Sequence, residues 1–161
     1  MADLKNYVVI LKESLKKKKA VLQALLESTR RQKDYIDNAE EFDPDVFQES
    51  LDEKDALLEE LNQLDQGFEQ LFMQVGSDLK AEQEMYRKDI DDMQSMIREC
   101  TGLGVDIERL EQQNKNKLSV RFSEQKKEIR KIKTTNKVAS TYYKTMSNTH
   151  NTDAYFMDQK K

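Results

Sequence analysis

The stretch EKDALLEELNQLDQGFEQLF, residues 53–72, decides the fold of this 161-residue chain. Through it and its flanks, apolar side chains recur at alternating spacings of four and three residues: Phe47, Leu51, Leu58, Leu61, Phe68, Phe72, Val75 and Leu79. Lys54 and Asp65 occupy two positions of the same series, and Leu57, Leu64 and Leu71 flank it. This spacing places the series along one side of an α-helix, where it packs against other helices. The stretch therefore predicts a long helix that contacts two neighbours at once.

The start of this helix is marked by capping residues. We expect Asp43 as N-cap and Pro44 as the first helical residue, with Phe42 and Phe47 packed as a hydrophobic staple. Gly76 followed by Ser77 is typical of a helix end and the next helix start.

The other helices follow from similar patterns. A first helix is expected from about Asp3 to Lys33, with its buried series at Leu4, Val8, Leu11, Leu15, Lys18, Leu22 and Leu25, widened by Val21 and Leu26. A third should end near Cys100, because two glycines in Thr101–Gly104 cost roughly 1 kcal/mol each inside a helix. A turn is favoured over a kink there. A fourth helix would run from Val105 to about Met146.

The expected fold is therefore all-α, an elongated up-and-down bundle of about four long antiparallel helices. Residues 1–146 would form a single domain and residues 147–161 a flexible tail. At 1.5 Å per residue, the last helix would outrun its partners near Glu128. Beyond that point an apolar stripe continues at helical spacing: Ile129, Ile132, Val138, Ala139, Tyr142, Tyr143 and Met146. An apolar stripe without an internal partner indicates an external one, so these are the candidate binding residues.

Composition favours a soluble, cytoplasmic protein. Charged residues make up 36% of the chain and hydrophobic ones 37%, a balance typical of long exposed helices. The first residues contain only a short apolar run, and no stretch approaches the roughly 20 apolar residues of a membrane span. The single cysteine, Cys100, excludes an internal disulfide and fits a reducing compartment.

The net charge of −4 conceals three opposing blocks. Residues 1–36 carry +5, residues 37–111 carry −17 and residues 112–161 carry +8. Antiparallel helices drawn from such blocks attract one another, so the basic segments do not require a nucleic-acid partner. Most of the run Lys16–Lys19 should face solvent. Lys18 instead falls on the buried series. Its level on the antiparallel neighbour is near Leu61, within a turn of Asp65, so Lys18 either pairs with Asp65 to fix the register or extends to solvent.

Catalytic chemistry has little support. The only histidine, His150, lies in the polar tail without further ligands for a metal. Cys100 has no histidine base near it in the sequence, and Asp91 and Asp92 diverge on a helix because they are adjacent. No lysine follows Thr101–Gly104 as a phosphate loop requires. We expect no enzyme activity, no cofactor and no metal.

Several segments together resemble the FlgN family of flagellar export chaperones. The EKD start and GFEQLF finish of residues 53–72 are followed by LKAEQEMYRKDIDDMQSMI, VDIERLEQQNKNKL, ASTYYKTM and AYFMDQKK. The resemblance covers nearly the whole chain from Phe47, although leucine heptads recur widely. It implies a helical bundle whose C-terminal helix, about residues 129–146 here, holds an amphipathic helix of an export client.

The resemblance also implies partners. These are hook-associated proteins of the FlgK and FlgL type and the flagellar export apparatus, with no membrane insertion. Tyr155, Phe156 and Met157 form either a short docking element in the tail or a segment that folds back on the bundle. The alternative function is a structural or adaptor coiled-coil protein without an export client, which predicts a homo-oligomer.

Overall fold

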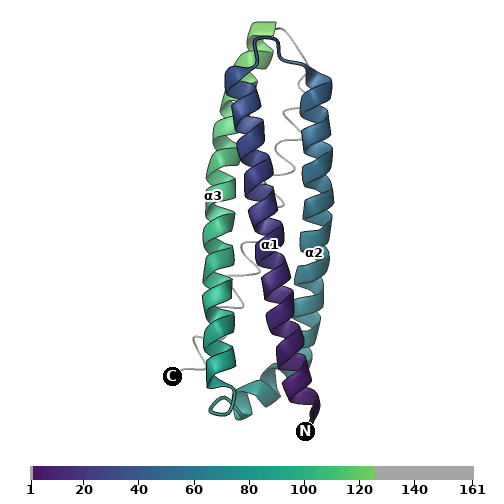
Figure 1. Ribbon diagram of the computed structural model, residues 1–161, viewed down its shortest axis with the longest axis vertical. Helices are drawn as coiled ribbons and strands as arrows, with labels where there is room; N and C mark the ends of the chain where they lie inside the picture. Colours follow the sequence, from purple (N-terminus) through teal and green to yellow (C-terminus); the bar gives the residue numbers. More distant parts are fainter. Residues whose placement is uncertain (1, 126–161) are drawn as a thin grey trace.

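A computed structural model describes residues 2–125 and consists there of three long helices. They are α1 (Ala2–Asn38), α2 (Pro44–Ala81) and α3 (Arg87–Gln125). The described chain is elongated, and α1 lies alongside both other helices (Figure 1). Helices α2 and α3 each pack against α1, but their backbones do not approach each other closely. The all-α, elongated architecture is confirmed.

The prediction of four helices with breaks at Gly76–Ser77 and Thr101–Gly104 is wrong for the described residues. Gly76 is buried inside α2, which continues to Ala81, and residues 101–104 lie inside α3. Burial outweighs the propensity cost of the glycines, because Cys100 and Ile107 on either side of them are buried in the core. Thr101 also fits the helix, since its hydroxyl donates to the Ile97 carbonyl oxygen at 2.9 Å.

The real break between α2 and α3 is a tight turn at Glu82–Tyr86. The Glu82 amide donates to the Asp78 carbonyl oxygen at 3.0 Å, and the Tyr86 amide donates to that of Glu82 at 3.3 Å. The turn contains no proline or glycine, which explains why turn propensity did not reveal it. Helix α1 likewise runs five residues beyond its predicted end at Lys33.

The connection between α1 and α2 confirms the predicted start of α2. Asp43 is the N-cap, its carboxylate accepts from the Asp45 amide at 2.9 Å, and Pro44 opens the helix. The rings of Phe42 and Phe47 lie 5.6 Å apart, as a hydrophobic staple requires. Arg121 of α3 closes this end, because its guanidinium donates to the carbonyl oxygens of Ile36 and Ala39 at 2.7 and 2.9 Å.

Two apolar clusters fill the interior. The connection-side cluster, near the α1–α2 connection, contains Val21, Leu22, Leu25, Leu26, Ile36, Phe42, Phe47, Leu51, Leu58, Leu61, Cys100, Ile107 and Leu118. The turn-side cluster, near the α2–α3 turn, contains Leu4, Val8, Leu11, Leu15, Phe68, Val75, Leu79, Tyr86, Ile90, Met93 and Ile97. Every predicted buried position of α1 is buried. In the series of α2 that begins at Phe47 and ends at Leu79, Asp65 and Phe72 are half-buried and the other members are buried. Across residues 2–125, none of the helices has an apolar stretch of the length that a membrane crossing requires.

Candidate functional site

A buried ion pair joins α2 to α3 in the connection-side half. The Lys54 ammonium contacts the Glu111 carboxylate, and the two side chains are 0% and 1% exposed. Lys54 also donates to the Gln32 side-chain oxygen at 2.8 Å, and the Thr29 hydroxyl lies 3.3 Å from the same carboxylate. Both Gln32 and Thr29 belong to α1, so the three helices meet in one polar cluster.

Two further polar side chains extend this cluster. The Gln32 amide donates to the Ser50 hydroxyl at 2.8 Å, and the Asn114 amide donates to the Thr29 carbonyl oxygen at 3.1 Å. Each contact joins two helices and fixes their relative position along the bundle axis. Buried polar contacts of this kind disfavour shifted packings, because a shift would leave charges without partners.

The environment of Lys54 also bears on chemistry. Burial lowers its pKa to about 7, while the neighbouring Asp55 acts in the opposite direction. An amine with such a pKa could serve as a base or form a Schiff base in an open cleft. The Lys54 side chain is fully enclosed, so no substrate can reach it. The cluster therefore sets the packing of the helices and offers no catalytic site.

Of the two alternatives that the sequence left open for Lys18, the structure shows the pair with Asp65. Their charged atoms lie 2.7 Å apart, and the side chains are 6% and 12% exposed. Burial raises the pKa of Asp65, and the Lys18 charge opposes that rise. Cys100 is free and buried nearby, and burial raises the pKa of its thiol to about 11. It is therefore protonated at neutral pH and does not act as a nucleophile.

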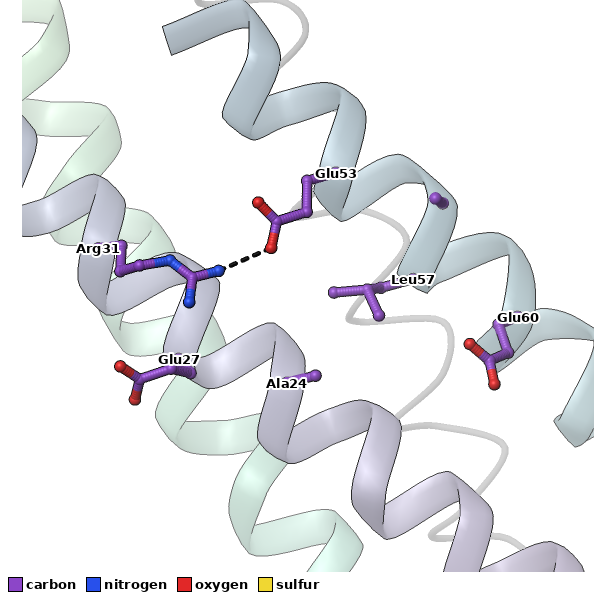
Figure 2. Close-up of a pocket in the computed structure, with 7 residues that line it drawn as sticks. Ala24, Glu27, Arg31, Glu53, Leu57 and Glu60 are labelled. Atoms are coloured by element: carbon purple, nitrogen blue, oxygen red, sulfur yellow. Dashed lines mark hydrogen bonds and ion pairs between the residues drawn. The ribbon is translucent and has the colours of Figure 1, made fainter. Parts of the chain in front are cut away.

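An open groove lies on the outer surface between α1 and α2, with a volume of about 560 Å³. We call it the α1–α2 groove, and its lining residues are Ala24, Glu27, Arg31, Glu53, Ala56, Leu57 and Glu60. Figure 2 shows Leu57 pointing from α2 toward α1 between Glu53 and Glu60, with Ala24 on the opposite wall. Arg31 bridges the groove to Glu53 at 2.6 Å. This surface has an apolar floor and acidic sides.

The exposed surface of α2, both at the groove and beyond it, is strongly acidic. Nine of its carboxylate side chains are exposed: Asp45, Glu49, Asp52, Glu53, Asp55, Glu59, Glu60, Glu69 and Asp78. Lys80 is the one exposed cation of this helix, because Lys54 is buried. In residues 2–125, Glu53 is the only one of the nine that forms an ion pair. The acidic block of the sequence is therefore only partly neutralised by the helices that α2 contacts there.

The candidate binding residues from the sequence lie outside the described residues. This applies to Ile129, Ile132, Val138, Ala139, Tyr142, Tyr143 and Met146, to Tyr155, Phe156 and Met157 of the tail, and to His150. Within residues 2–125, no group of three or more His, Cys, Asp or Glu side chains could hold a metal ion.

Sequence reasoning missed both the polar cluster and the groove. Lys54 stood out as a charge on the apolar series, but its partner Glu111 was assigned to a separate helix by the erroneous break at Thr101–Gly104. The groove had a visible signal in Leu57, the first of the three leucines that flank the series. Comparison of the chain with protein-family models, with curated proteins and with solved structures finds no match.

Proposed function

We propose that this protein is a cytoplasmic flagellar export chaperone of the FlgN type. Its clients would be hook-associated proteins of the FlgK and FlgL type, which it keeps soluble and delivers to the export apparatus. The mechanism is helix-in-groove binding, in which an amphipathic client helix is held without nucleotide hydrolysis. The sequence resemblance motivates this proposal, and the elongated helical architecture is compatible with it.

The observation that carries the proposal is the position of Arg121 of α3. Its guanidinium donates to the carbonyl oxygens of Ile36 and Ala39 at the α1–α2 connection, so α3 has reached this end of the bundle by residue 121. The apolar stripe of residues 129–146 follows this point in the sequence. We propose that this stripe holds the client.

A double substitution tests this assignment. Replacing Ile132 and Tyr143 with Ser should abolish client binding and leave the melting temperature nearly unchanged. Burial of two large apolar side chains in a partner contributes roughly 1.5–3 kcal/mol each, or two to three decades of affinity or more. The measurements are calorimetric titration with a C-terminal fragment of a hook-associated protein and a thermal melt of the same sample.

The matched control removes two exposed apolar residues elsewhere. Met73 and Met85 are 77% and 75% exposed, so Met73→Ser with Met85→Ser should change neither client affinity nor stability. Intact client binding by the folded Ile132→Ser, Tyr143→Ser protein would exclude the stripe as the client site. Self-association without affinity for any client fragment would favour the structural or adaptor coiled-coil function.

A further inference from the structure

The α1–α2 groove has features of a helix-docking surface. Leu57 on its floor is half-buried and packs against the connection-side cluster. Ala24 and Ala56 leave little bulk on the walls, so another helix could approach closely. Its volume of about 560 Å³ accommodates several side chains of an incoming helix.

Two further leucines of α2 stand in series with Leu57 beyond the lining of the groove. Leu64 and Leu71 follow Leu57 at intervals of seven residues, which is about two helical turns, so all three lie on one side of α2. Both are half-buried and pack against the core beneath them. Gly67 lies between them and has no atom within 4 Å of the position that a Cβ would take. A heptad series of half-buried leucines matches the surface that a helix of several turns would cover.

The charges around the groove select the kind of partner. Glu27, Glu53 and Glu60 surround the apolar floor, and Arg31 is the only cation among the lining residues. Arg31 already pairs with Glu53, and Glu60 has no ion pair within residues 2–125. A partner with an acidic surface, including nucleic acid, would be repelled, whereas lysine and arginine side chains would find carboxylates on both sides.

We propose that the α1–α2 groove binds a basic amphipathic helix of a partner protein. The helix would place aliphatic side chains against Leu57, Leu64 and Leu71, and its lysines or arginines would pair with Glu27 and Glu60. None of these residues is among those proposed to hold the client, so neither proposal depends on the other.

The test uses the full-length chain and a fluorescein-labelled 18-residue helical peptide, with leucines along one face and lysines on both flanks. The decisive variant is Glu60→Lys, in the groove. Its matched control is Glu69→Lys, which makes the same charge change on the opposite side of α2, because nine residues are two and a half turns. Both glutamates are exposed, so both variants should fold.

Fluorescence anisotropy at low salt should show about tenfold weaker peptide binding for Glu60→Lys, while Glu69→Lys stays within about twofold of the parent. Equal weakening by both variants would mean general attraction to an acidic chain and would overturn the proposal, as would the absence of binding. Sedimentation velocity of the parent chain tests whether a second copy of the chain occupies the groove instead. A dimer that Glu60→Lys dissociates would assign the groove to a second copy, which would also overturn the proposal of a separate partner.

Discussion

The two halves of the bundle are built from the same three helices but differ in their interiors. On the connection side, the charged pair Lys54 and Glu111 is enclosed together with Gln32, Thr29 and Asn114. On the turn side, Gln94 is the one buried polar residue that residues 2–125 place among the apolar side chains, and the pair Lys18–Asp65 lies between the halves. Apolar burial stabilises any packing of suitable volume, whereas a buried ion pair is satisfied at one register only. Both halves therefore contribute apolar burial, and the connection side in addition favours a single register of the helices.

The largest effect is expected from breaking the ion pair on one side. Glu111→Ala leaves the Lys54 ammonium buried next to a cavity, so the free energy of unfolding should fall by about 3–5 kcal/mol. Replacing both partners by apolar residues, Lys54→Met with Glu111→Leu, should recover most of that loss, because no charge is then left unpaired. Urea unfolding of both variants checks this. A single substitution that costs less than about 1 kcal/mol would contradict the buried pair.

The apolar half is tested by Phe68→Ala. Phe68 is 8% exposed and its ring lies 6.0 Å from that of Phe72, so truncation removes buried area and leaves a cavity. We expect a loss of about 3 kcal/mol in the free energy of unfolding, seen as a lower thermal midpoint. Met73→Ala is the matched control on the same helix, because Met73 is 77% exposed and its truncation should change stability by less than about 0.5 kcal/mol. Equal effects would mean that the buried face of α2 is misassigned.

Much of this comparison was accessible from the sequence. Local spacing predicted the burial of the α1 series, the Asp43 cap and the Phe42 staple. The Lys18–Asp65 pair was one of two alternatives that the level of two antiparallel helices left open. The boundaries of the last helices were predicted incorrectly. Local propensity placed a break at residues 101–104, but burial of Cys100 and Ile107 depends on contacts distant in the sequence and overrides it.

The candidate sites likewise depend on contacts between residues that are distant in the sequence. The groove needs the relative positions of Ala24 and Leu57, which lie on different helices, so no local pattern predicts its walls. The polar cluster depends on Glu111 of α3 lying beside Lys54 of α2. Because the helix boundary was predicted in the wrong place, this position of Glu111 could not be predicted. The stripe of residues 129–146 stays a prediction from spacing alone.

The pH dependence of stability separates the two halves a second way. Burial lowers the pKa of Lys54 to about 7 in the folded chain, against 10.5 as its ordinary value. Below pH 7 both states bind this proton, and folding carries the full cost of burying the ammonium. Above pH 7 the unfolded chain binds more protons, so the free energy of unfolding should rise with pH. We expect the free energy of unfolding to rise by roughly 1–2 kcal/mol between pH 7 and 9. The rise is limited because the Glu111 carboxylate favours the charged form of Lys54 and so opposes the effect of burial.

The measurement is urea unfolding at several pH values in that range. Cys100 opposes the rise only at the top of the range, because its thiol ionises near its ordinary pKa of 9.0 in the unfolded chain, whereas burial raises that pKa to about 11 in the folded chain. The variant Lys54→Met with Glu111→Leu lacks both members of the pair and should lose this rise. An identical slope in the parent and the variant would show that Lys54 stays charged across the range.

The smallest effect is expected from Gly102→Ala, at the junction of the two halves. Gly102 lies inside α3 and is exposed, and an added Cβ would meet no atom within 4 Å. Alanine restricts the unfolded chain more than glycine does and suits a helix interior, so stability should rise by about 0.4–1 kcal/mol. Gly67→Ala on α2 is the matched control with the same open surroundings and the same expected gain. Chemical denaturation resolves the difference. A loss at Gly102 beside a gain at Gly67 would indicate a turn in α3 and would divide the bundle into two separately packed halves.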